Sequence, residues 1–329
     1  MNKQMIVSYL VSLLLVAIII AFVDLEEVLR QVIGFGAVHF TVISVLSIAT
    51  FVFRGIIWKE LLKPFTEISL LESTYITTIG FFANNVLPLR IGEIVRAYVL
   101  SVHKKIGKVK SFSSVLAERI VEGLTLVAFF VAGIAFLPSI GPELKQLILL
   151  PVALFVALLL VFLFPGKALA ITRKLFSGFK FFYKVEHLLE DFVSGGKAMR
   201  NGLRPNAIIW GASIATWGLL AVIYHVAAVQ LGLEFSLAEL LLLVSVTGLS
   251  VMIPSAPGFI GTFEFGFILA FSALGLSAEA ATSMAVILHL AFWISTNIAG
   301  LIALNRLNLS FSSIMAMEKV EEAKERAVK

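Results

Sequence analysis

The 329-residue sequence contains no cysteine and little charge. The absence of cysteine excludes disulfides, thiolate catalysis and cysteine-ligated metals, although it leaves the redox compartment undetermined. Charged residues make up 14% of the chain, against about 25% in soluble domains. So little charge excludes a soluble domain large enough to fold on its own.

Apolar residues dominate instead, at 59% of the chain, and the mean hydropathy is +1.00. Crossing a hydrocarbon core of about 30 Å takes roughly 20 apolar residues in a helix, and several stretches meet that length. The sequence therefore predicts an all-α integral membrane protein. The net charge of +5 is expected to report orientation in the membrane, and no nucleic-acid partner is expected.

Six apolar runs are long enough to predict full membrane spans. They are Met5–Val23, Val38–Ile57, Ser113–Leu137, Gln146–Phe164, Ala207–Leu231 and Ala280–Leu304.

Two further apolar segments, Leu70–Val102 and Leu237–Gly275, are broken in the middle. The first break is the sequence Asn-Asn-Val-Leu-Pro at 84–88, and the second is Ile-Pro-Ser-Ala-Pro-Gly at 253–258. Proline removes a backbone donor and glycine loosens a helix. Each segment is therefore predicted to be a helical hairpin with irregular backbone at its tip.

Cations gather at Arg54–Lys63, Arg90–Lys110, Lys167–Arg204 and after Arg306, whereas the alternate connections carry few. By the positive-inside rule, both termini are expected to be cytoplasmic, in the cell (plasma) membrane. The first hairpin must then enter from the cytoplasmic side and the second from the outer side.

An internal repeat in the sequence agrees with the entry of the two hairpins from opposite sides. Pro88 and Pro257 are 169 positions apart, and the same offset aligns Gly92 with Gly261. We expect two inverted-topology repeats, residues 1–137 and 138–304, with a cytoplasmic amphipathic insert at 166–205 and a cytoplasmic tail at 305–329. Paired broken helices in inverted repeats mark transporter binding sites. A chance match between ordinary kinks is the alternative.

Polar residues around the first break are candidates for substrate binding. A helix that restarts after proline exposes backbone N–H groups, which attract anions. Arg90 adds a forked donor suited to phosphate, and Glu93 can pair with Arg96 at i,i+3. The alternative is that these charges only fix topology. The candidates here are Asn84, Asn85, Pro88, Arg90, Gly92, Glu93 and Arg96.

The second break also has a helix that restarts after proline, but no cation lies near it in the sequence. Glu264 lies one turn into the new helix, where it could bind a proton, a cation or an arginine from the other half, or only complement the helix dipole. The candidates here are Ser255, Pro257, Gly258, Gly261, Thr262 and Glu264.

A third candidate group lies inside the span 113–137. Glu118 and Glu122, at i,i+4, share a helix face, where two like charges repel unless a cation lies between them. The pair could accept Arg90 or Arg96, and Arg119 belongs to the same candidate group. A structural salt-bridge network and a transport relay both fit. His289 is an intramembrane histidine without the spacing of a metal site, so packing with a hydrogen bond is expected, and it also counts among the candidate substrate-binding residues.

Three motifs in order resemble a known family. They are Asn85-x-x-Pro88-x-Arg90-x-Gly92-Glu93-x-x-Arg96, Glu118-Arg119, and Pro254-x-x-Pro257-Gly258-x-x-Gly261-x-x-Glu264. The chain, from about Met5 to Leu304, resembles the flippase-like membrane domain of lysylphosphatidylglycerol synthases and of stand-alone bacterial and archaeal proteins. The resemblance implies movement of aminoacylated phosphatidylglycerol between leaflets in the synthases, and roles with lipid-linked sugars and envelope assembly in stand-alone relatives.

Two departures from that family matter. The synthases carry a soluble aminoacyl-transferase domain after the membrane part, whereas this sequence ends at Lys329, so no lipid aminoacylation is expected. The family also commonly has an arginine where His289 stands.

The leading hypothesis is a lipid translocator, not an enzyme, that moves an anionic phospholipid or a lipid-linked sugar between leaflets. It needs no cofactor and no metal. The rival hypotheses are a membrane enzyme or enzyme subunit acting on polyprenyl-phosphate-linked sugars, and a membrane scaffold. Protein partners stay open between a second copy of the chain and an enzyme of envelope biosynthesis.

Overall fold

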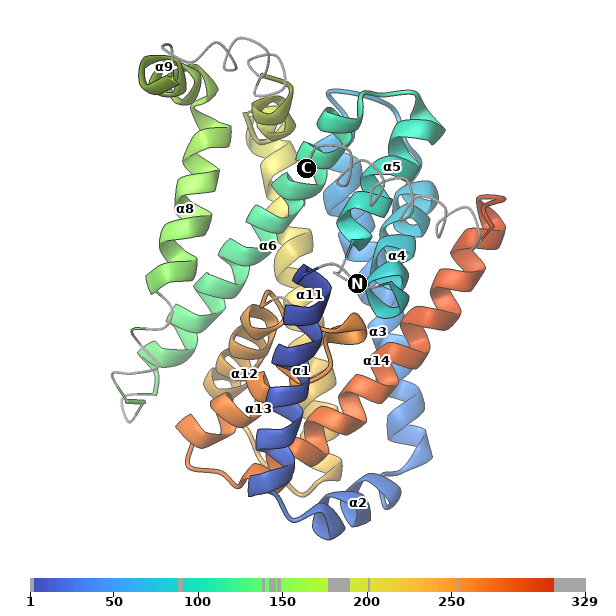
Figure 1. The fold of residues 1–329 in the computed structure, drawn as a ribbon, viewed down its shortest axis with the longest axis vertical. Helices are drawn as coiled ribbons and strands as arrows, with labels where there is room; N and C mark the ends of the chain where they lie inside the picture. The colour runs from blue at the N-terminus through green and yellow to red at the C-terminus, as the bar shows by residue number, and fades with distance from the viewer. Residues whose placement is uncertain are drawn as a thin grey trace.

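The computed structural model describes residues 3–87, 91–137, 140–141, 146, 149–176, 190–200, 202–253 and 255–310, and its ordered elements are all helices (Figure 1). No strand occurs in these ranges. The prediction of an all-α protein is therefore confirmed.

Three helices are long and apolar enough to cross a membrane: α3 (Ala37–Leu62), α11 (Leu203–Gln230) and α14 (Ala278–Arg306). Two bent pairs pass the same criterion. Helix α1 (Lys3–Phe22) turns by 97° into α2 (Leu25–Ile33), and α8 (Leu149–Leu163) turns by 101° into α9 (Pro165–Phe176). The described residues thus contain three spans, or up to five if each bent pair is one span.

This count is lower than the six full spans expected from the apolar runs. Helix α6 (Lys108–Ala135) has 28 residues, which is long enough, but Glu118, Arg119 and Glu122 lie inside its apolar stretch. A membrane-embedded, multi-pass chain is supported, and the sixfold count stays a prediction.

Helix α2 was not predicted, because nine residues are too few for a span. Asp24 caps it, with one carboxylate oxygen accepting from the backbone N–H groups of Glu26 and Glu27. Val28 is buried against the bundle, whereas Leu29 and Ile33 are exposed on the same apolar side. An amphipathic helix bent sharply from its neighbour is suited to the membrane interface.

Each predicted hairpin is a pair of helices separated by a break. The first pair is α4 (Leu70–Val86) and α5 (Gly92–Lys104), and the second is α12 (Leu237–Ser250) and α13 (Thr262–Ala273), with the short 3₁₀ helix η3 (Pro257–Phe259) between them. Figure 1 shows α4–α5 in the upper part of the molecule and α12–α13 in the lower part. Helix η3 packs against α4, so the two breaks approach each other.

Both hairpins begin with the same local device. Ser69 and Ser236 each form a capping box, in which the serine accepts from the backbone of Glu72 or Glu239 and that glutamate accepts from the serine N–H. Glu72 also contacts His103 and Lys104, each at 3.0 Å, which joins the open ends of the first hairpin.

The predicted amphipathic insert at 166–205 is not a surface helix throughout. The 3₁₀ helix η2 (Gly195–Arg200) lies within it, and Ala198 and Met199 are buried in an apolar cluster with residues of α3, α6 and α8. A Cβ added at Gly196 would come 2.5 Å from the Cβ of Phe162, so the missing side chain permits this close packing. This contact could not be predicted from the sequence, because the segment is mostly polar.

The close contact inside the first hairpin predicts a sensitive glycine. A Cβ added at Gly92 would overlap the carbonyl oxygen of Gly80 and would lie 2.6 Å from the Asn84 side chain. We expect Gly92→Ala to lower the free energy of unfolding by about 1–3 kcal/mol, because α4 and α5 must separate. Thermal unfolding in detergent measures it, with Gly218→Ala as the control, since a Cβ there meets nothing within 4 Å. Equal stability of the two variants would contradict this packing.

Candidate functional site

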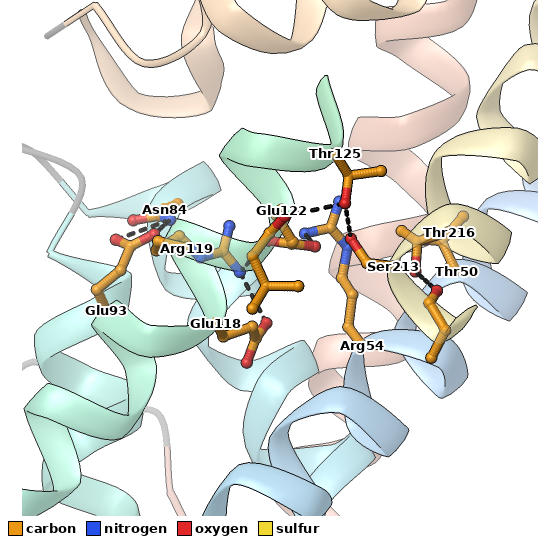
Figure 2. A network of polar contacts seen from close by, with 12 residues as sticks. Thr50, Arg54, Asn84, Glu93, Glu118, Arg119, Glu122, Thr125, Ser213 and Thr216 are labelled. Atoms are coloured by element: carbon orange, nitrogen blue, oxygen red, sulfur yellow. Dashed lines mark hydrogen bonds and ion pairs between the residues drawn. The ribbon is translucent and has the colours of Figure 1, made fainter. Parts of the chain in front are cut away.

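A cluster of buried charges lies where α3, α5 and α6 meet (Figure 2). Arg96 pairs with Glu118, and Arg54 pairs with Glu122. Arg119 joins the two pairs, with its Nη2 2.9 Å from Glu118 Oε1 and 3.0 Å from Glu122 Oε2. Arg119 thus lies between the two members of the i,i+4 acid pair, and Arg96, one of the two arginines that the sequence offered as a partner of that pair, contacts Glu118.

Aromatic rings surround the guanidinium groups. The Arg96 guanidinium lies 3.8 Å from the ring centre of Trp58. The Arg54 guanidinium lies 4.7 Å from the ring of Phe81 and 5.3 Å from that of Trp217. Because Glu118 is 0% exposed, its charge depends on these cations in place of water. Cation–π contacts add attraction that does not require solvent.

Asn84 and Gly92 form the joint of the first hairpin. The Asn84 side-chain oxygen accepts from the Gly92 backbone N–H at 2.7 Å, and its Nδ2 lies 3.4 Å from both Glu93 carboxylate oxygens. Asn84 is only 2% exposed. Its contacts hold the start of α5 in place, and a part in substrate binding stays a prediction.

The second break is held by a histidine from α14. His289 Nδ1 lies 2.5 Å from Glu264 Oε1, and His289 Nε2 lies 2.5 Å from the carbonyl oxygen of Gly258. Glu264 Oε2 also accepts from the Gly261 N–H at 2.7 Å. Gly258 and Gly261 have φ values of +73° and +87°, which favour glycine. The expectation that His289 is packed and hydrogen-bonded is confirmed.

These contacts fix the proton count of the pair. A carbonyl oxygen can only accept, so His289 Nε2 carries a proton, and the contact to Glu264 needs a second one. The second proton sits either on His289 Nδ1 or on the carboxyl group. Glu264 and His289 together thus hold two protons and are neutral overall, as an ion pair or as two neutral groups.

Ser12 of α1 completes the second break and was missed by the sequence analysis. Its hydroxyl accepts from the Ala256 N–H and donates to the Ile260 carbonyl, both at 2.8 Å. Ser12 is 4% exposed and lies more than 240 positions away in the chain. One side chain thereby satisfies two buried backbone groups that the irregular segment leaves unpaired.

A cavity of about 160 Å³ lies between the two breaks. Asn85 lines it from the first hairpin, and Gly258, Phe259 and Phe263 line it from the second. Arg54 and His289 also face it. Its walls include several aromatic residues, namely Phe51, Phe81, Trp217, Tyr224, Phe292 and Trp293, and the hydroxyl-bearing residues Ser47, Thr50, Thr247 and Thr296.

The remaining predicted site residues differ in how far the structure describes their contacts. Ser255 is buried and its hydroxyl has no hydrogen-bond partner among the described residues, whereas the Thr262 hydroxyl donates to the Phe259 carbonyl at 3.0 Å. Pro257 begins η3. Pro88 and Arg90 lie outside the described residues.

Arg54 was missed as a site residue because it was attributed to the basic cluster that follows it, although its place inside the span 38–57 was a signal.

Comparison with known families agrees with this geometry. The model of the lysylphosphatidylglycerol synthase transmembrane region matches residues 5–300. The chain belongs to that family. The resemblance drawn from the three motifs is therefore confirmed. No solved structure matches the chain.

Two curated relatives of this family member are archaeal. The UPF0104 membrane protein MJ1595 of Methanocaldococcus jannaschii is 25% identical over 316 residues, which covers 90% of this chain and 92% of the relative. The glycosyltransferase AglD of Haloferax volcanii is 24% identical over 354 residues, covering 96% of this chain but 56% of that protein.

The Ser12 contacts predict a loss of stability on Ser12→Ala. The buried Ala256 N–H and the Ile260 carbonyl would both lose their partner, so the free energy of unfolding should fall by about 1–3 kcal/mol. Ser283→Ala is the control, because the Ser283 hydroxyl is buried and has no hydrogen-bond partner. Chemical unfolding in detergent measures both, and an unchanged Ser12→Ala variant would mean that the hydroxyl does not hold the break.

Arg54 and Glu122 should behave as a coupled pair. Arg54→Gln removes one of the two cations on Glu122, and we expect a loss of about 3–5 kcal/mol, since an incompletely paired buried charge is costly. Removing both charges in Arg54→Gln/Glu122→Gln should recover at least about 1 kcal/mol of that loss. Unfolding free energies of the two single variants and the double variant form the cycle. Additive losses would contradict the coupling.

Proposed function

We propose that this protein translocates lipids, and that the head group of an anionic phospholipid or a lipid-linked sugar passes through the cavity between the two broken hairpins. The observation that carries the proposal is the cavity itself, because residues of both breaks line it and two basic side chains face it. Sites between broken helices near the middle of a membrane protein are where transporters bind substrate.

The proposal assigns roles to the polar residues. Arg54 attracts the head-group phosphate, and Arg90, at the first break, acts as a second phosphate ligand. The buried network of Glu118, Arg119 and Glu122 holds Arg54 in place. Arg96 anchors α5 to that network, and the carboxylate of Glu93 balances the remaining positive charge of the network. Glu264 and His289 provide a proton-bearing pair at the second break.

The larger architecture is part of the same proposal. Two inverted repeats and six spans would place the hairpins on opposite sides of the membrane, with both termini in the cytoplasm of the cell. Alternating exposure of one cavity to the two leaflets would then move a head group without moving it through hydrocarbon.

An enzyme acting on polyprenyl-phosphate-linked sugars is the second candidate. Two observations favour it: one relative is named a glycosyltransferase, and Glu264 with His289 has the composition of a general acid–base pair. That relative is almost twice as long as the region matched here, since the chain covers 56% of it.

Purified protein in liposomes separates the two functions. We expect fluorescent phosphatidylglycerol to move between leaflets without chemical change, as measured by loss of protection from a membrane-impermeant quencher. Mass spectrometry of the same lipids would show a new product if the enzyme hypothesis held. Neither movement nor product would contradict both.

Glu264→Gln should slow translocation at least about tenfold while the protein still folds. Glutamine can accept from the Gly261 N–H and donate to a neutral His289, so the contacts persist but the carboxylate that stabilises a charged His289 is lost. The exposed Glu234→Gln is the control. An unchanged rate in Glu264→Gln would remove this pair from the transport step.

A further inference from the structure

The charges that face the cavity differ from those that lie behind it. Arg54 and His289 line the cavity, and both are basic. Their carboxylate partners, Glu122 and Glu264, contact them but do not line it. Among the described lining residues there is no carboxylate, and the undescribed residues of the two breaks, Pro88 to Arg90 and Pro254, include no acid.

This arrangement discriminates between head groups. A phosphate entering the cavity meets the Arg54 guanidinium, whereas His289 belongs to a pair with Glu264 that is neutral overall. An ammonium group would meet the same guanidinium with no carboxylate on the lining to pair with, which is unfavourable at low dielectric. The aromatic walls and hydroxyls accept neutral, hydroxylated groups instead. Thr50, which carries a hydroxyl, and Trp217, which is aromatic, line the cavity together with Arg54. The Trp217 ring lies 5.3 Å from the Arg54 guanidinium.

We propose that the cavity selects a lipid phosphate whose attached group is uncharged and hydroxylated, and that it rejects aminoacylated and other ammonium-bearing head groups. This inference rests on the proposed translocation and narrows its substrate. It also separates this chain from the lysylated lipid in the name of its family. Two lipid sources share the selected chemistry: the glycerol head group of phosphatidylglycerol and a polyprenyl phosphate carrying one hexose.

A competition experiment on the purified protein tests the selection. Native mass spectrometry would compare phosphatidylglycerol, a polyprenyl-phosphate hexose, lysylphosphatidylglycerol and a hexosyl diacylglycerol at equal concentrations. We expect lysylphosphatidylglycerol and the phosphate-free lipid to bind at least tenfold more weakly than one of the first two, and the stronger of those two identifies the source. Equal binding of lysylphosphatidylglycerol would overturn the inference.

A single isosteric change should reverse the preference. Asn85→Asp places a carboxylate on the cavity wall at nearly constant volume, so it should shift the ratio of lysylphosphatidylglycerol to phosphatidylglycerol binding by at least tenfold toward the lysyl lipid. Asn305→Asp, on the exposed end of α14, is the matched control and should leave the ratio unchanged. An unchanged ratio in a folded Asn85→Asp protein would overturn the inference.

Translocation assays with the same lipids distinguish a failure of the head-group selection from a failure of the proposed translocation. If wild-type protein moves phosphatidylglycerol and lysylphosphatidylglycerol at equal rates, the selection is wrong and the proposed function stands. If it moves none of the four lipids, the proposed function fails and the selection fails with it.

Discussion

Buried charges without access to water constrain this fold more than any other feature. A charge near the centre of a bilayer costs about 2.5–3.5 kcal/mol on insertion scales, and this protein buries Arg54, Arg96, Glu118 and Glu122 almost completely. Each must therefore be paired by a neighbour from another helix. The alternating chain Arg54, Glu122, Arg119, Glu118, Arg96 meets that requirement and ties α3, α5 and α6 together.

The same requirement explains the second break, with different chemistry. Irregular backbone inside a membrane protein needs partners for its N–H and C=O groups. Ser12 supplies two of them, His289 contacts the Gly258 carbonyl, and Glu264 accepts from Gly261. The first break is thus supported by the Asn84–Gly92 hydrogen bond and, through Arg96 of α5, by the ionic network, whereas hydrogen bonds from α1 and α14 support the second. The cavity lies between these two supports.

The sequence predicted what depends on composition and local pattern. Long apolar runs predicted the helices, proline and glycine predicted both breaks, and the i,i+4 spacing of Glu118 and Glu122 indicated a pair that could accept Arg96. Roles that depend on tertiary packing were beyond it. A single serine in an apolar helix gives no local sign that it contacts a break more than 240 positions away, as Ser12 does. Asn84 carried a polar signal, but only the close approach of α4 and α5 shows that it caps Gly92.

The central claim is that the two breaks enclose one path for lipid head groups. The absence of native cysteine makes a direct test possible. A protein carrying Asn85→Cys and Phe259→Cys, one on each break, would be joined by a short thiol cross-linker after reconstitution, and lipid translocation would be measured before and after. The account predicts that cross-linking blocks translocation and that a reductant-cleavable linker restores it, because the breaks must separate to pass a head group. Full-rate translocation by the cross-linked protein would contradict the account.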